Sequence, residues 1–117
     1  MNAIIELQNW FKAQCNGEWE HKLGVEIETC DNPGWIVNID LKDTSLESRK
    51  FEVIAKNVSQ KWIDQAMGKV SAPYECEEPL SPDWMLCFVK DGKFNGAGGL
   101  TKLEEILITF LKWSKEK

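Results

Sequence analysis

Hydrophobic residues near the start of the chain recur at the spacing of a helix. Their apolar stripe consists of Ile4, Leu7, Trp10 and Phe11. Asn2 precedes the stripe and is a residue type that caps a first helical turn. Asn16-Gly17 follows it with residues that tolerate the left-handed backbone of a helix end. The pattern predicts an amphipathic helix over residues 2–16.

After a polar segment, the period changes to that of a strand. Val25, Ile27 and Thr29 alternate with Glu26, Glu28 and Cys30. The segment Asn32-Pro33-Gly34-Trp35 then predicts a tight turn, because proline and glycine suit its two central positions. Trp35, Val37, Ile39 and Leu41 line one side of a returning strand. We therefore expect a hairpin over residues 24–41, whose first strand has one acidic face.

The middle of the chain gives a weaker pattern. Phe51, Val53 and Ala55 indicate a third strand, and residues 59–67 a short helix that ends at Gly68. Three prolines and the acidic cluster Glu75, Glu77 and Glu78 fall within residues 70–82. This composition predicts a long acidic loop, a kind of segment that often carries function.

The last third of the chain predicts two strands and a helix. Residues 84–89 are apolar on both faces, as in a central strand, and Asp91-Gly92 is a strong signal for a hairpin turn into residues 93–97. Thr101 and Glu104 have the spacing of a capping box at the start of a final helix with a broad apolar face.

These elements predict an α+β fold with an antiparallel sheet of about five strands, packed against N- and C-terminal helices. The 117 residues are about the length of one domain, so we expect a single domain over residues 1–117. No apolar run approaches the length of a membrane span, and the first residues lack the apolar stretch of a signal peptide. A soluble, cytoplasmic protein is expected.

Acidic residues are unevenly distributed. Residues 1–47 hold nine acidic side chains against three lysines, and residues 71–89 hold four acidic side chains and no basic one. Such a distribution repels phosphate backbones and attracts basic proteins, so we expect a protein partner and no direct nucleic-acid binding. The lack of a long apolar run leads us to expect no membrane partner.

His21 and the four cysteines are the candidates for chemistry. His21 lies beside carboxylates, which allows acid–base work, but it lacks the further ligands of a metal site, so a structural or interface role is favoured. Cys76 lies between Glu75 and Glu77, whose charges disfavour its thiolate. Cys15, Cys30 and Cys87 have the contexts of small buried residues. We expect no catalytic residue, no metal and no cofactor.

Two tryptophans and one glycine-rich segment leave alternatives open. Trp19 and Trp35 flank polar turns, so each is either an exposed binding anchor or a wedge that closes the end of the sheet. The segment Gly96-Ala97-Gly98-Gly99 precedes a helix start, but it lacks the other residues of a phosphate-binding loop. A sharp strand-to-helix turn explains these glycines equally well.

Two stretches resemble a bacterial family of polymorphic-toxin immunity proteins, immunity protein 53. The first comprises Gly17-Glu18-Trp19-Glu20-His21, Gly24, Asp31-Asn32-Pro33-Gly34-Trp35 and Ile39-Asp40-Leu41. The second comprises Asp83-Trp84, Asp91-Gly92-Lys93-Phe94, Gly96, Gly98 and Leu103-Glu104-Glu105-Ile106-Leu107, continuing to Phe110 and Trp113. Residues 44–82 match least.

The resemblance implies a protein encoded beside a secreted toxin, which binds that toxin in the producing cell and blocks it. The residues expected to contact the toxin are Glu18, Trp19, Glu20, His21, Glu26, Glu28, Asp31, Trp35, Asp40, Glu75, Glu77 and Glu78. Whether the toxin is a nuclease, and the oligomeric state of its inhibitor, stay open. The alternatives are a small sulfurtransferase related to rhodaneses, a label that some family members carry, and a small-molecule binding domain.

Overall fold

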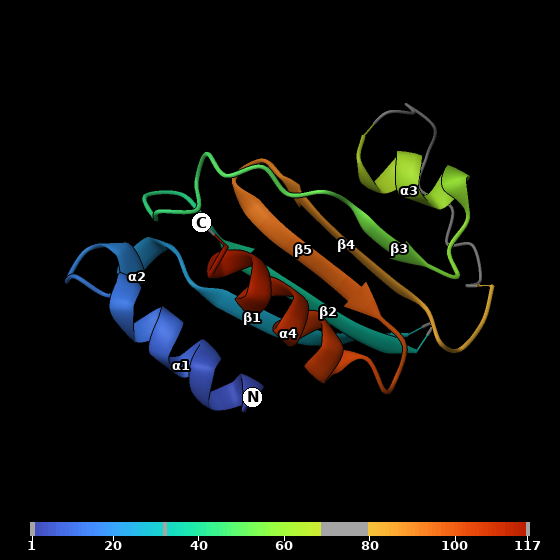
Figure 1. Cartoon of the computed structure of the whole chain (residues 1–117), viewed down its shortest axis with the longest axis horizontal. Helices are drawn as coiled ribbons and strands as arrows, with labels where there is room; N and C mark the ends of the chain where they lie inside the picture. The colour runs from blue at the N-terminus through green and yellow to red at the C-terminus, as the bar shows by residue number, and fades with distance from the viewer. Residues whose placement is uncertain (1, 32, 69–79, 117) are drawn as a thin grey trace.

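The computed structural model describes residues 2–31, 33–68 and 80–116. Its elements in chain order are α1 (Ala3–Gln14), α2 (Trp19–Lys22), β1 (Val25–Cys30), β2 (Gly34–Asp40), β3 (Ile54–Lys56), α3 (Gln60–Ala66), β4 (Met85–Lys90), β5 (Lys93–Gly98) and α4 (Leu103–Ser114). The strands form one antiparallel sheet in the order β1-β2-β5-β4-β3. Helices α1 and α4 lie side by side on one face of this sheet (Figure 1). The predicted α+β class is confirmed.

Two local hairpins build most of the sheet. Strands β1 and β2 pair from Val25 opposite Ile39 to Cys30 opposite Gly34, as the alternating pattern predicts. Strands β4 and β5 are joined by Asp91-Gly92, where both residues have positive φ, the backbone of a tight hairpin turn. The pairing of β2 with β5 joins the hairpins at the centre of the sheet, although these strands are far apart in sequence.

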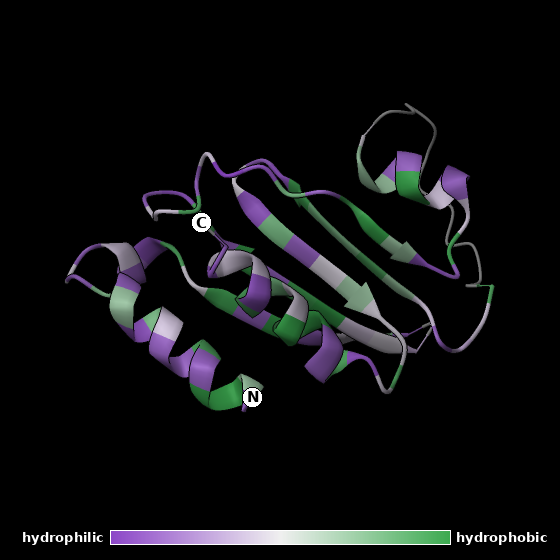
Figure 2. Ribbon diagram, viewed as in Figure 1, coloured by the Kyte–Doolittle hydropathy of each residue, from purple (hydrophilic) through white to green (hydrophobic). Residues whose placement is uncertain are grey.

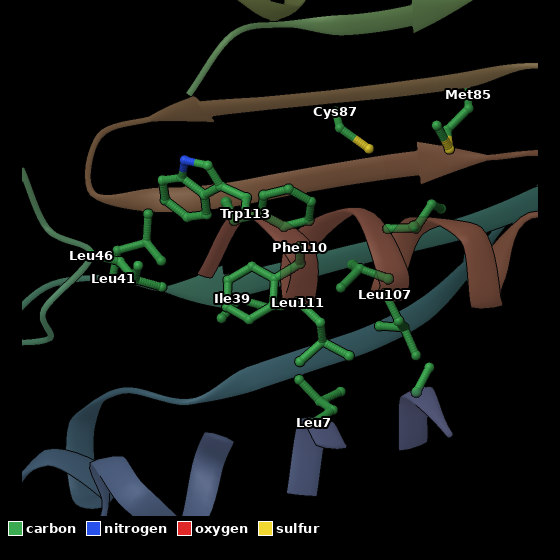
Figure 3. Packing of buried hydrophobic residues seen from close by; sticks show 14 residues of the cluster. Leu7, Ile39, Leu41, Leu46, Met85, Cys87, Leu107, Phe110, Leu111 and Trp113 are labelled. Atoms are coloured by element: carbon green, nitrogen blue, oxygen red, sulfur yellow. The ribbon is translucent and has the colours of Figure 1, made fainter. Parts of the chain in front are cut away.

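The core lies between the sheet and the two long helices. Figure 3 shows Phe110 and Leu111 of α4 among side chains from β2, β4 and α1. The ring of Phe110 meets Trp10 of α1 edge-on at 5.0 Å and lies 5.2 Å from Phe94 of β5. Such aromatic pairs stabilise a fold beyond the area that they bury. They fix both helices to the centre of the sheet.

Hydrophilic and hydrophobic residues alternate over the first half of β5 (Figure 2), and two glycines follow on the side that faces α4. A Cβ atom on Gly96 would lie 2.4 Å from Ile106 Cγ2, and one on Gly98 would lie 2.6 Å from Lys102 Cβ. The glycines therefore let α4 approach the sheet closely. This role accounts for the glycine-rich segment without a phosphate site.

The helix ends confirm the cap predicted at Asn2, reveal a further cap at Ser59 and correct the one predicted at Thr101. Asn2 and Ser59 cap α1 and α3 through side-chain oxygens that accept backbone N–H groups. The capping box of Thr101 and Glu104 is wrong, because α4 begins after Lys102 and has no side-chain cap. A turn in which the Lys102 amide donates to the Gly99 carbonyl, at 3.0 Å, replaces it.

Three further regions differ from the sequence patterns or fall outside the structure. The polar segment before β1 contains the short helix α2, and the third strand is limited to three residues. Most of the predicted acidic loop lies outside the described residues, including Glu75, Glu77 and Glu78.

None of the helices in the described part of the chain combines the length and apolar character that a membrane span requires.

Candidate functional site

Strand β1 presents two chemically different sides. Glu26 and Glu28 are exposed on the sheet face opposite the long helices, whereas Val25 and Ile27 face α1. Because side chains alternate along a strand, the two glutamates lie on the same side, two residues apart. β1 is also the outermost strand on its side of the sheet. The predicted acidic face therefore lies at a sheet edge.

The strand register shows which side chains lie beside these glutamates. Glu26 is opposite Asn38 of β2, which is opposite Asn95 of β5. Glu28 is opposite Ile36, which is half-buried and is followed across the sheet by Ala97. The face opposite α1 and α4 thus carries carboxylates on β1, and amide and small apolar side chains on β2 and β5. This composition suits a protein partner better than a polyanion.

Asp40 lies at the end of β2 on the same face, and its carboxylate already contacts other groups of the protein. Its Oδ2 accepts a hydrogen bond from the Gly24 amide at 2.9 Å, and its Oδ1 lies 3.8 Å from Lys93 Nζ. The carboxylate closes the end of the β1–β2 ladder, where the Asp40 amide donates to the Gly24 carbonyl at 3.0 Å. Of the predicted contact residues, Asp40 is thus one with a clear structural role.

In and just before α2, some side chains make internal hydrogen bonds and others are exposed to solvent. Asn16 Oδ1 accepts the amides of Glu18 and Trp19 at 3.0 and 2.9 Å, and Glu20 Oε1 accepts those of Asn16 and Gly17 at 3.0 and 3.1 Å. Hydrogen bonds from the Glu20 amide and from these neighbouring amides lower the pKa of the Glu20 carboxyl group. Glu18 and His21 remain exposed.

The two tryptophans that flank polar turns, Trp19 and Trp35, differ in burial. Trp19 is only 5% exposed, contacts the rings of Trp10 and Phe11, and donates its Nε1–H to the Lys42 carbonyl at 2.8 Å. Its interpretation as an exposed anchor is wrong, because it fills the space between α1 and the end of β2. Trp35 is half-buried and donates its Nε1–H to the Leu100 carbonyl at 3.0 Å. Asp31, at the hairpin turn, is exposed.

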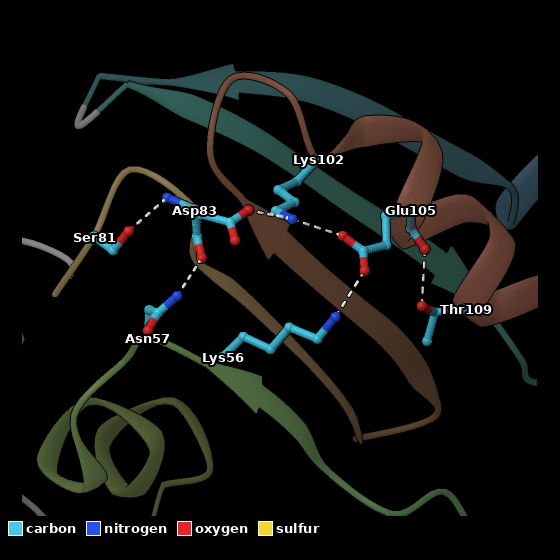
Figure 4. Close-up of polar contacts among 7 residues, drawn as sticks. All are labelled: Lys56, Asn57, Ser81, Asp83, Lys102, Glu105 and Thr109. Carbon is cyan, nitrogen blue, oxygen red and sulfur yellow. Dashed lines mark hydrogen bonds and ion pairs between the residues drawn. The ribbon is translucent and has the colours of Figure 1, made fainter.

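Lys102 and Glu105 form an ion-pair network that sequence reasoning missed (Figure 4). Lys102 Nζ contacts Asp83 and lies 2.9 Å from Glu105 Oε2, while Glu105 Oε1 lies 2.8 Å from Lys56 Nζ. The hydrogen bonds to Asp83 and Glu105 raise the pKa of Lys102, and those from Lys56 and Lys102 lower the pKa of Glu105. The network ties β3 and the start of β4 to α4. Because its charges are mutually paired, it offers little to a partner.

A second missed feature is a groove between α1 and the edge strand β1. Its volume is about 380 Å³, and its lining is mostly apolar: Ile4, Leu7, Gln8, Phe11, Leu23, Gly24, Val25 and Ile27. Ile4, Phe11 and Ile27 are 52%, 37% and 41% exposed. Their spacing predicts apolar faces, but only the place of β1 at the edge leaves these side chains uncovered. We call this feature the edge groove.

Comparison with protein families identifies the chain. Residues 4–115 match the family described as immunity protein 53. The chain belongs to the immunity protein 53 family. No curated protein and no solved structure matched it. The family match therefore suggests an immunity function, and the geometry above shows which surfaces the described residues expose.

Many residues that carry the resemblance to the immunity protein 53 family are used to build this fold. Trp19, Glu20 and Asp40 make the internal contacts described above. Trp84 is 2% exposed and packs against Trp62 of α3 with ring centroids 5.0 Å apart, and Trp113 is 5% exposed. Both tryptophans are therefore core residues. The residues shared with the family thus include many that stabilise the fold, whereas the exposed acidic residues Glu26 and Glu28 of β1 are not among them.

The thiols of this immunity protein 53 member offer limited support for sulfur chemistry. Burial raises the pKa of the Cys87 thiol to about 12, so it stays protonated and a poor nucleophile near neutral pH. The expected burial of Cys15 is wrong, because its side chain is exposed at the end of α1, with Sγ 3.3 Å from the Phe11 carbonyl oxygen. Cys76 lies outside the described residues. Among the described residues, no group of three or more His, Cys, Asp and Glu side chains is arranged to hold a metal ion.

Proposed function

We propose that this protein is an immunity protein that binds the toxin encoded beside it and neutralises it as a stoichiometric inhibitor. The observation that carries the proposal is the family match over residues 4–115. The exposed carboxylates of Glu26 and Glu28 support it, because an acidic surface attracts a basic partner and speeds its capture. Binding, rather than turnover, is then the whole activity.

The proposed contact surface is centred on the acidic side of the first hairpin. Glu18, His21 and Asp31 extend it from the exposed positions on either side of β1. Trp19, Glu20 and Asp40 act within the proposal as supports for that surface. Trp35 and the acidic residues Glu75, Glu77 and Glu78 complete the set of proposed contacts.

The test is titration of the adjacent toxin with the purified protein. We expect inhibition to be complete at one equivalent, and active toxin to be recovered when the complex is dissociated. Inactivation of many equivalents of toxin by one equivalent of this protein would contradict the proposal, because it would show turnover. Absence of both binding and inhibition would also overturn it.

The electrostatic part has its own test. Reversing two charges, with Glu26→Lys and Glu28→Lys, should slow association with the toxin on the order of tenfold at low salt, and less at high salt, where charges are screened. A double variant with Glu52→Lys and Glu116→Lys is the matched control, because it makes the same change in net charge at exposed positions elsewhere. Equal association rates for the two double variants would remove the assigned role of β1.

A further inference from the structure

We propose that the toxin is held by strand addition: an extended toxin segment with alternating apolar and basic residues pairs with the open edge of β1. This inference rests on the proposed function and specifies how the partner binds. It follows from three features of β1, namely the direction of its backbone groups, the edge groove on one side and the two glutamates on the other.

At its outer edge, β1 has backbone N–H and C=O groups that point away from β2. In an antiparallel pair, residues alternate between those that bond to the neighbouring strand and those whose N–H and C=O point away. The bond from the Asp40 amide to the Gly24 carbonyl sets this alternation for β1 and β2. Even-numbered residues of β1 therefore bond to β2, and Val25, Ile27 and Thr29 direct their backbone groups to the open edge.

The central pairing in the sheet confirms this alternation independently. The Leu41 amide donates to the Gly92 carbonyl at 2.8 Å, so odd-numbered residues of β2 bond to β5. Even-numbered residues of β2 must then bond to β1, in agreement with the bond at Asp40. Within the described residues, no strand lies beyond β1.

The edge groove supplies the apolar half of the recognition. Ile27 of β1 lies across it from Ile4 and Phe11 of α1, and all three side chains are substantially exposed. A strand added beside β1 would place every second side chain on the helix side of the sheet, next to these residues. Apolar side chains at those positions would cover the groove, and main-chain hydrogen bonds would add affinity, as in other cases of strand addition.

The glutamates supply the charged half and select the occupant. The remaining side chains of the added strand would lie on the face of Glu26 and Glu28, where lysine or arginine directly opposite is favourable. A second copy of this chain fits poorly. If two β1 strands paired antiparallel with Ile27 at the centre, each Glu26 would lie opposite a Glu28, and like charges in that position are destabilising. The partner strand should therefore be basic.

The backbone contact is tested by proline substitution at an edge-facing amide. Thr29→Pro removes an N–H that points away from β2 and spares the β1–β2 ladder, so the fold should be retained. Thr29→Val keeps the amide and is the matched control. We expect Thr29→Pro to bind the adjacent toxin at least tenfold more weakly than Thr29→Val. Equal affinity of the two variants would overturn strand addition.

A second pair of variants tests the groove without altering the backbone. Ile27→Lys introduces a charge into the edge groove, and Val53→Lys makes the same change at a residue of similar exposure, 42% against 41%, just before β3. We expect at least a tenfold loss of toxin affinity for Ile27→Lys alone. Matching affinities would show that the groove is not used.

Hydrogen exchange separates this inference from the proposed function. The amides of Val25, Ile27 and Thr29 should exchange rapidly in the free protein and become protected in the complex with toxin. If the toxin is bound and inhibited while these amides stay unprotected, strand addition is wrong and the immunity function stands. If the wild-type protein does not bind the toxin, both proposals fall.

Discussion

The sheet ends in two unlike edges. β3 has three residues, and its Lys56 is paired with Glu105 of α4, whereas β1 has six residues and borders an uncovered apolar groove. Proteins commonly protect edge strands by making them short or by placing charges on them, because unpaired backbone groups invite other strands. The β3 edge follows the first strategy. The β1 edge is long and carries two exposed glutamates, which under the strand-addition proposal discourage self-pairing and favour a basic partner.

The segment before β3 is held by the end of α4. Trp113 donates its Nε1–H to the Lys50 carbonyl at 2.9 Å and contacts Phe51 edge-on at 5.2 Å. Arg49 Nη1 donates to the carbonyl oxygens of Trp113 and Ser114 at 3.0 and 3.2 Å. No comparable clamp among the described residues covers β1. The difference suggests that the two edges contribute unequally to stability.

The largest expected effect comes from removing this clamp. Trp113→Ala should lower the free energy of unfolding by about 3–5 kcal/mol, because it deletes a large buried ring and leaves a cavity. Phe11→Ala, in the wall of the edge groove, should cost only about 1–2 kcal/mol, because Phe11 is 37% exposed already. Urea denaturation of both variants measures the difference. Equal losses would mean that the two edges are equally important for the fold.

The sequence predicted the features that depend on neighbouring residues. Residues 24–41 form a hairpin, and Asp91-Gly92 joins β4 to β5, because turn chemistry and alternation act over a few positions. The apolar run of residues 84–89 indicated a central strand, and β4 lies between β5 and β3. These elements need no long-range information.

What the sequence could not predict depends on contacts between distant segments. The exposure of Ile27 follows from the place of β1 at the edge, which is set by the pairing of β2 with β5. Trp19 is buried because the fold brings the Lys42 carbonyl and the aromatic rings of α1 against its side chain. Lys102 pairs with Asp83 across the start of β4, a contact that no local spacing indicates. The acidic pattern of β1 was visible, but its role at an edge was not.

A smaller effect should follow from neutralising the acidic protection of β1. The double variant with Glu26→Gln and Glu28→Gln removes the repulsion between opposed β1 strands, which is worth up to about 1 kcal/mol for each opposed pair. We expect stronger self-association of this variant at low salt, measured by sedimentation velocity at high protein concentration. A double variant with Glu52→Gln and Glu116→Gln has the same net charge and should self-associate no more than the wild type. If both variants behave alike, the glutamates do not protect the edge.

The smallest effect concerns the network at the other edge. The pKa of Glu105 is lowered by Lys56 and Lys102, so its contribution to stability is complete above the unfolded-state pKa and is lost as the pH falls through the folded-state value. Glu105→Gln should therefore be less stable than the wild type at pH 7, by less than about 1 kcal/mol because the pair is solvent-screened. The gap should close towards pH 3. Glu104→Gln, an exposed change in the same helical turn, controls for the helix dipole. A gap that is independent of pH would show that the ion pairs of Glu105 do not stabilise the β3 edge.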